Sequence, residues 1–154
     1  MNIDCIFLGP TGEQYLNQGI ADFQKRLSRY CPVRIKIIKE RKGKIADAVR
    51  IETEGRDLLE QVEQKSLVVA LDRTGRRVDS EMFAELFRQW QDQNRRTVSF
   101  IIGGSLGLSS EVLSASDVVL SLSAMTFTHE MARLILLEQV YRSFTILAGT
   151  KYHK

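Results

Sequence analysis

The sequence is poor in the residues that build cross-linked or metal-stabilised proteins. It contains only two cysteines, Cys5 and Cys31, and two histidines, His129 and His153, and their spacing matches no common metal-ligand pattern. We therefore expect no structural or catalytic metal. Because no basic segment followed by an apolar run occurs near the N-terminus, we expect a cytoplasmic protein whose cysteines are reduced thiols.

Long apolar runs, linkers and repeats are also missing. The longest apolar stretches, such as residues 67–71, have the length of a strand and fall far short of the roughly 20 residues of a membrane span. Only two prolines occur, and no stretch has low complexity or a fixed repeat. A chain of 154 residues supplies one hydrophobic core, so we expect a single domain covering residues 1–154.

Short runs rich in β-branched and aromatic residues alternate with helical patterns. The expected strands run from Ile3 to Leu8, Val33 to Ile38, Leu67 to Leu71, Val98 to Ile102 and Val118 to Leu122. This alternation predicts an α/β fold with a mostly parallel sheet and helices on both faces. Ligands of such sheets bind beyond the carboxyl ends of strands, which favours the loops after Leu71, Ile102 and Leu122.

Capping and spacing signals mark the expected helices. Thr11 and Gln14 have the spacing of a capping box before a helix that includes residues 16–30. A second helix, around residues 48–62, contains Gly55, which indicates a close approach by another backbone. A third follows Asp79 and Ser80, and a short fourth follows residues 109–110.

The last expected helix, from about His129 to Leu147, carries apolar side chains around most of its circumference. One small domain can hardly bury all of that surface. We therefore expect a homodimer interface.

Basic residues are grouped although the formal net charge is only +3. One group lies in a single segment, a second follows the third expected strand, and a third lies at the C-terminus. They are Arg34, Lys36, Lys39, Arg41, Lys42, Lys44 and Arg50; Arg73, Arg76 and Arg77; and Lys151 and Lys154. Solvated surface and phosphate-contacting patches are both compatible with this pattern.

Three glycines, Gly103, Gly104 and Gly107, follow the fourth expected strand. Residues without side chains at a strand-to-helix turn let a ligand touch the backbone directly. A phosphate cradle would favour a glycine fingerprint on the first strand or a P-loop lysine, and neither is present. An adenine slot and plain chain reversal remain as alternatives.

The same turn spells Gly103-x-Ser105-x-Gly107, the pattern of a nucleophile elbow, and Asp117 and His129 follow in the order used by hydrolases of that fold. A serine hydrolase using these three polar residues is therefore an alternative function. Against it, the chain is short and no His-Gly-Gly oxyanion motif precedes the turn. Asp117 also suits a polar residue entering the fifth strand.

Several segments together make the chain similar to a known family. They are Ile102-Gly103-Gly104-x-x-Gly107-Leu108, Leu122-Ser123-Ala124-Met125-Thr126-Phe127-x-His129, Arg133 and the ending Tyr152-His153-Lys154. With these residues the whole chain resembles the ribosomal large-subunit methyltransferase H family, which belongs to the knotted SPOUT methyltransferases. One position departs from the family, which usually has proline where this chain has Thr128; the threonine can instead cap the last helix.

The resemblance implies a homodimer with a C-terminal trefoil knot that binds S-adenosyl-L-methionine in a bent form. The cofactor contacts would fall at Leu71, Gly103, Leu122, Ser123, Ala124, Met125, Thr126 and Phe127. The resemblance further implies methylation of N3 of a pseudouridine in helix 69 of 23S rRNA in the assembled ribosome. A sulfonium cofactor needs no anion cradle, and backbone groups in tight loops can recognise its adenine.

Four side chains are candidates for catalysis. His129 and Arg133 are one helical turn apart, either as a buried structural pair or as RNA contacts. The resemblance implies that Tyr152 and His153 complete the partner subunit's pocket, where Tyr152 stacks on a base and His153 orients it or accepts a proton. A frayed C-terminal end is the alternative for this tail, and a noncatalytic RNA-binding module is an alternative for the whole protein.

Overall fold

Five strands form one parallel sheet in the computed structural model of the chain, which describes residues 1–153 apart from the side chain of His153. The strands are β1 (Asn2–Leu8), β2 (Val33–Ile38), β3 (Leu67–Arg77), β4 (Thr97–Ile102) and β5 (Val118–Ser121). Their spatial order is β2-β1-β4-β3-β5. The α/β fold with a parallel sheet is thus confirmed, and every expected strand is present.

Strand β3 is longer than expected because it pairs with β5 twice. Residues 69–71 lie opposite residues 118–120, and after an irregular stretch Arg76 and Arg77 pair again with the end of β5. Gly75 lies in this stretch, and a Cβ on it would come within 2.6 to 2.8 Å of backbone atoms of β5. Only a glycine lets the two segments approach this closely.

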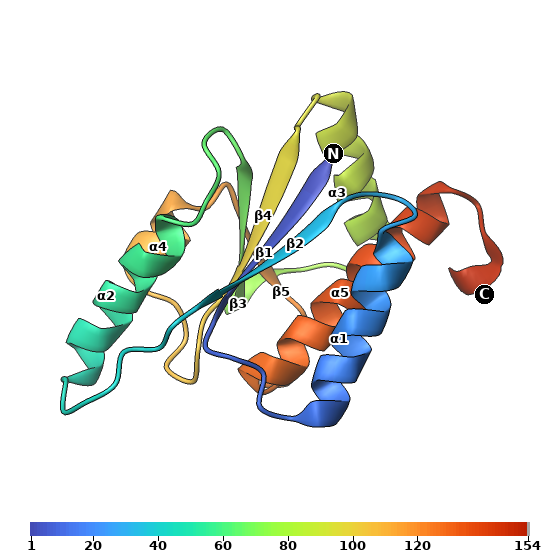
Figure 1. Cartoon of the computed structure of the whole chain (residues 1–154). Helices are drawn as coiled ribbons and strands as arrows, with labels where there is room; N and C mark the ends of the chain where they lie inside the picture. Colours follow the sequence, from blue (N-terminus) through green and yellow to red (C-terminus); the bar gives the residue numbers. More distant parts are fainter. Residues whose placement is uncertain (154) are drawn as a thin grey trace.

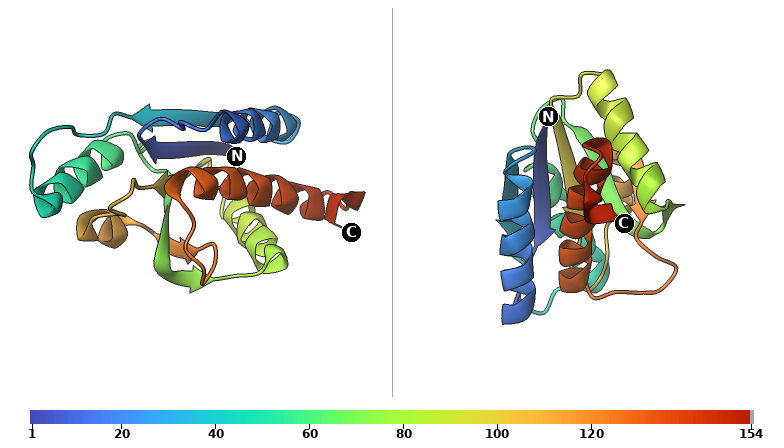
Figure 2. Two further views of the ribbon diagram at one scale, coloured as in Figure 1. Left: turned by 90° about the horizontal axis from the view of Figure 1, so that it is seen from below. Right: turned by 90° about the vertical axis from the view of Figure 1, so that its right-hand side faces the viewer.

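Helices cover both faces of the sheet, as expected (Figures 1 and 2). On one face lie α1 (Gln14–Leu27), α3 (Ser80–Asp92) and α5 (His129–Leu147), with α5 between the other two, and a 3-10 turn, η1 (Lys151–His153), follows α5. The other face carries α2 (Asp47–Leu59) and α4 (Ser110–Ala115). Because strand side chains alternate between faces, Phe7 belongs to the larger hydrophobic core and Ile6 to the smaller one.

Three helices begin at a side-chain cap. Asp79 accepts a hydrogen bond from the backbone N–H of Met82 at 2.7 Å before α3, and Ser109 caps α4. Thr128 caps α5 by accepting from the N–H of Met131 at 3.2 Å. Each cap satisfies one of the N–H groups that a helix start leaves without a partner, and the capping role expected for Thr128 is confirmed.

The capping box expected at the start of α1 is wrong. The residue before α1 is Glu13, and its side chain makes no capping hydrogen bond. Instead the carboxylate of Glu130, in the first turn of α5, accepts from the N–H of Gly12 at 3.0 Å and from that of Glu13 at 3.3 Å. These hydrogen bonds hold the pKa of Glu130 below its usual value. A tertiary contact has replaced the local cap.

Gly55 marks the contact between α2 and α4. A Cβ on Gly55 would overlap the hydroxyl of Ser109 and lie 3.2 Å from Cγ2 of Val112. The expected close approach is therefore present, but the neighbour is a side chain rather than a backbone.

Helix α5 buries one side and leaves another partly open. Leu136, Leu137 and Val140 are fully buried, whereas Met131 and Ile135 are only partly covered. Apolar side chains on this helix are therefore left partly exposed in the single chain. No helix among the described residues is long and apolar enough to cross a membrane.

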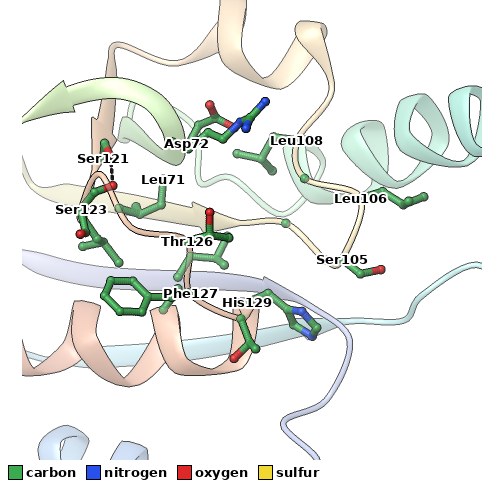
Figure 3. A pocket seen from close by; sticks show the side chains of 18 of the residues that line it. Leu71, Asp72, Ser105, Leu106, Leu108, Ser121, Ser123, Thr126, Phe127 and His129 are labelled. Atoms are coloured by element: carbon green, nitrogen blue, oxygen red, sulfur yellow. Dashed lines mark hydrogen bonds between the residues drawn. The ribbon is translucent and has the colours of Figure 1, made fainter.

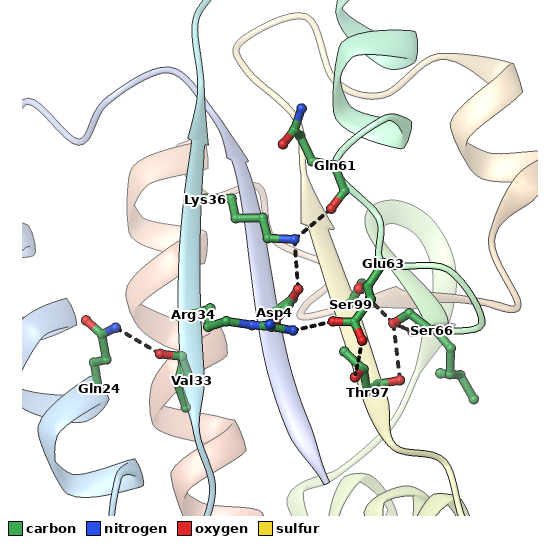
Figure 4. Close-up of polar contacts among 11 residues, drawn as sticks. Asp4, Gln24, Val33, Arg34, Lys36, Gln61, Glu63, Ser66, Thr97 and Ser99 are labelled. Atoms are coloured by element: carbon green, nitrogen blue, oxygen red, sulfur yellow. Dashed lines mark hydrogen bonds and ion pairs between the residues drawn. The ribbon is translucent and has the colours of Figure 1, made fainter.

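A buried carboxylate on β1 holds two residues of the first basic group (Figure 4). Asp4 is fully buried, and its oxygens pair with Arg34 at 2.7 Å and with Lys36 at 2.9 Å. Arg34 also pairs with Glu63, and Lys36 donates to the carbonyl of Gln61 at 2.8 Å. Because a buried carboxylate requires such partners, these two cations serve the fold.

Candidate active site

A cleft of about 870 Å³ opens at the carboxyl ends of β3, β4 and β5 (Figure 3). Its walls are residues 71–73 of β3, the turn 102–108 after β4, and most of the segment 121–129 between β5 and α5. This is the position that the topology predicted, because parallel strands present their loops together at this edge of the sheet.

The glycine-rich turn forms one wall of the cleft. A Cβ on Gly103 would collide with the carbonyl of Gly107, whose own N–H donates to the Gly104 carbonyl at 3.1 Å. Gly107 has φ +84° and open space where a Cβ would be. The turn therefore needs glycine both for tight reversal and for a backbone that faces the cleft without side-chain cover.

The segment after β5 forms the opposite wall. The Ser121 hydroxyl donates to the carbonyl of Ser123 at 2.9 Å, and the Ser123 hydroxyl accepts from the N–H of Met125 at 2.9 Å. Within residues 1–153, the N–H groups of Ala124, Thr126 and Phe127 have no hydrogen-bond partner. This wall can therefore donate hydrogen bonds to a ligand.

Apolar side chains around the cleft are unusually exposed. Met125 is 75% exposed, Phe127 is 38% exposed and Leu106 is 37% exposed, and all three line the cleft. Apolar surface beside free N–H groups is the composition of a small-molecule site.

Most of the expected cofactor contacts lie together in this cleft. Those that line it are Leu71, Gly103, Leu122, Ser123, Met125, Thr126 and Phe127. Ala124 is in the same segment but does not line it. Other lining residues, which were not predicted as cofactor contacts, include Asp72, Arg73, Ser121, Leu106, Leu108 and Ala132. The sequence offered one signal for these residues, because each lies close along the chain to a predicted cofactor contact or to His129.

Two of the candidate catalytic residues, His129 and Tyr152, are not brought together within one chain. His129 lines the cleft (Figure 3). Arg133 is fully buried; it donates to the carbonyl of Leu8 and, at 2.9 Å, to the hydroxyl of Thr11. Burial lowers the pKa of Arg133, and its guanidinium lies 5.2 Å from the Phe7 ring centre. Arg133 therefore supports the connection between β1 and α1.

Tyr152 follows the end of α5 and folds back against Glu138 and Tyr141 in the middle of that helix, away from His129. Its hydroxyl donates to Glu138 at 3.2 Å, and its ring centre lies 4.8 Å from that of Tyr141. Burial and the Glu138 carboxylate raise the pKa of Tyr152, so the phenol stays protonated at neutral pH. The side chain of His153 and all of Lys154 lie outside the described residues.

The arrangement separates the three residues of the alternative hydrolase triad. Asp117 immediately precedes β5, and its carboxylate accepts from the N–H of Val68 at 2.8 Å, near the start of β3. Ser105 and His129 line the cleft at the opposite, carboxyl edge. Asp117 therefore cannot orient His129, and its simpler interpretation as a polar residue entering β5 is confirmed.

The fold and cleft define an α/β protein whose backbone loops form a cleft suited to a small molecule. The sequence matches the family described as "Predicted SPOUT methyltransferase" over residues 1–153. It is 46% identical over 154 residues to a ribosomal RNA large subunit methyltransferase H of Syntrophotalea carbinolica, covering 99% of each chain. It is 42% identical to the protein of that name from Desulfotalea psychrophila, covering 100% of both. The chain belongs to the SPOUT methyltransferases, in the ribosomal RNA large subunit methyltransferase H family.

Solved structures share the fold at low sequence identity. A probable methylase family protein from Haemophilus influenzae matches with a TM-score of 0.56 and 14% identity, over 99% of this chain and 70% of that one. A probable methyltransferase from Bordetella pertussis matches with a TM-score of 0.55 and 15% identity, over 93% and 96%.

Proposed function

We propose that this protein transfers a methyl group from S-adenosyl-L-methionine to N3 of a pseudouridine in helix 69 of 23S rRNA. The observation that carries the proposal is the backbone-lined cleft at the carboxyl ends of β3, β4 and β5. The names of the curated relatives supply the substrate class, ribosomal RNA of the large subunit. The assembled ribosome in the cytoplasm is the proposed target.

The cleft suits this cofactor. The free N–H groups of Ala124, Thr126 and Phe127 and the uncovered Gly107 offer hydrogen bonds to a purine. Leu71, Leu122 and Met125 offer apolar contacts. When bound, S-adenosyl-L-methionine supplies an electrophilic methyl group.

Positioning is the main task of the protein's own side chains. N3–H of pseudouridine is a weakly acidic imide, so methylation requires loss of its proton and alignment of the nitrogen with the methyl group. His129, on the wall of the cleft, is proposed to contact the base. Arg133 is proposed to act indirectly, by fixing the connection between β1 and α1 beneath His129.

A homodimer would complete the site. Tyr152 contacts Glu138 and Tyr141, which follow His129 by 9 and 12 residues in α5. At a rise of about 1.5 Å per residue these contacts lie roughly 14 to 18 Å along the helix from His129. As placed, the Tyr152 side chain therefore does not reach the cleft of its own chain. We assign Tyr152 and His153 to the partner subunit's cleft, where they would stack on the target base and orient it.

The trefoil knot and the single domain belong to the same proposal. Gly75 lies directly against the backbone of β5, and α5 then returns to the middle of the three-helix face. The chain thus passes β5 against the extension of β3 and then continues into α5, and this path supports a C-terminal region threaded through a loop. The two hydrophobic cores lie on opposite faces of one sheet, which supports one domain.

Mass mapping of rRNA from cells with and without the protein tests the reaction and the substrate together. We expect one helix 69 pseudouridine to lose its methyl group when the protein is absent. Purified protein should also transfer label from the methyl donor to ribosomes, which a noncatalytic RNA-binding module would not do. An identical methyl pattern in the two strains would overturn the proposal.

Deletion of residues 152–154 tests the tail separately. The shortened protein should bind S-adenosyl-L-methionine in calorimetry as the full chain does, because the described part of the tail lies away from the cleft. It should lose methyl transfer to ribosomes. Unchanged turnover by the shortened protein would refute the role of the tail and leave the assignment of the cofactor site standing.

A further inference from the structure

The two large groups of basic residues differ in what their side chains contact. In the first group Arg34 and Lys36 pair with Asp4, and Arg41 makes two hydrogen bonds to Asp57, at 2.7 and 2.8 Å. Arg50 donates to the carbonyl of Gly43. Four of the seven cations are therefore engaged within the protein. The remaining lysines, 39, 42 and 44, lie in the loop between β2 and α2.

The second group is not engaged in this way. Arg73, Arg76 and Arg77 are exposed, and in the part of the chain that the structure describes no carboxylate pairs with them and no hydrogen bond holds their side chains. The two nearest acidic residues in sequence are occupied. Asp72 accepts hydrogen bonds from the N–H and hydroxyl of Thr74, and Asp79 caps α3.

These arginines are also held at a fixed place beside the cleft. Arg73 lines the cleft itself. The backbones of Arg76 and Arg77 pair with Leu120 and Ser121, immediately before the segment that forms the cleft wall. A strand-bound backbone loses less conformational entropy when it binds a partner than a loop does, which favours these arginines over the three loop lysines.

We propose that the exposed guanidinium groups of Arg73, Arg76 and Arg77 form the surface that binds RNA phosphates at the mouth of the cleft. The inference rests on the proposed function and adds to it the place where RNA docks. A guanidinium presents a planar fork of donors that matches phosphate oxygens. Because these groups have no internal ion pair to break, binding a phosphate costs no existing contact.

The double variant R76A/R77A tests this surface and spares Arg73, which is close to the cofactor site. The matched control is R95A/R96A, a second adjacent arginine pair that is exposed, lacks side-chain partners among the described residues and precedes β4, at the opposite edge of the sheet. The measurements are equilibrium binding to purified ribosomes from 50 to 300 mM salt, binding of S-adenosyl-L-methionine, and kcat and KM for ribosomes.

Two lost phosphate contacts should reduce the slope of log affinity against log salt by about 1.4 for single-stranded RNA to about 1.8 for a duplex. If the variant and the unaltered protein bind ribosomes equally at 1 M salt, this difference in slope corresponds to an affinity loss of about 25- to 60-fold at 0.1 M salt. KM should rise by a similar factor, and cofactor binding should be unchanged. R76K/R77K should keep most of the salt slope, because charge is retained.

Equal ribosome affinity and equal salt slope for R76A/R77A and R95A/R96A would overturn the proposal that this surface binds RNA. If the unaltered protein binds ribosomes with a salt slope that R76A/R77A reduces but transfers no methyl group, the docking surface stands and the proposed reaction fails. If the unaltered protein methylates rRNA and R76A/R77A retains its KM, the reaction stands and the docking surface fails.

Discussion

Substitution of Gly55 by alanine is a test in which local and tertiary effects have opposite signs. Within a helix, alanine is favoured over glycine by about 1 kcal/mol. In this structure, however, a Cβ at position 55 would overlap the Ser109 hydroxyl and lie 3.0 Å from the Ser109 Cβ. That hydroxyl caps α4, so it cannot move away without loss of a hydrogen bond.

The expected magnitude follows from these contacts. Overpacking a closely packed contact costs about 1 to 3 kcal/mol, and losing a serine cap costs about 1 kcal/mol. Against the gain of about 1 kcal/mol in helix propensity, G55A should lower the free energy of unfolding by about 1 to 3 kcal/mol. The assay is urea unfolding at fixed protein concentration, because the proposed dimerisation would make stability concentration-dependent.

The partner variant S109G makes the test specific. Glycine at a helix cap costs only a few tenths of a kcal/mol, and it removes the side chain that blocks position 55. In the S109G background, G55A should therefore be neutral or stabilising by up to about 1 kcal/mol. A double-mutant cycle should give a coupling of at least about 1 kcal/mol between the two positions. The reasoning is refuted if G55A stabilises the unaltered protein, or if its effect is the same in both backgrounds.

Two further predictions concern the start of α5. Thr128 has φ −62° and ψ 149°, which proline can adopt. The variant T128P loses the helix cap but has a stiffer unfolded chain, so its stability should change by less than about 1 kcal/mol. T128A loses the cap without this compensation and should cost about 1 kcal/mol. Urea unfolding compares the two variants, and a loss above about 2 kcal/mol for T128P would contradict this reasoning. Because hydrogen bonds lower the pKa of Glu130, its contribution is present above its unfolded pKa of about 4.5 and is lost as pH falls through the lower folded value. The stability difference between the unaltered protein and E130Q should thus be constant from pH 6 to 8 and shrink in acid, and a difference independent of pH down to 3 would contradict the assigned contact.

The strands could be predicted because parallel strands are buried on both faces and their sequences form continuous apolar runs. The extension of β3 could not, because residues 72–77 are mostly polar and pair with β5 through backbone groups alone. The cap of α1 shows the same limit. Thr11 and Gln14 have the spacing of a local cap, but the carboxylate of Glu130, more than 100 residues away in sequence, supplies it.

The cleft was predictable from topology, while the roles of charged residues were not. Loops after successive parallel strands meet at one edge, so the segments around Gly103 and Phe127 were found without coordinates. Spacing along the chain gives no information on which cations have partners. Arg41 and Arg76 look equivalent in sequence, yet the first is held by Asp57 and the second has no partner among the described residues.

The separation of Tyr152 from His129 leads to a last prediction about the composite site. Mix H129A, whose cleft is disabled but whose tail is intact, with a chain that lacks residues 152–154, whose cleft is intact. Random exchange of subunits makes about half of the dimers mixed, and each mixed dimer has one complete site of two, so methyl transfer should recover to about one quarter of that of the unaltered protein. Each variant alone should be inactive. If subunits exchange, as mass spectrometry of labelled chains can verify, and no activity returns, then cleft and tail do not act across the dimer.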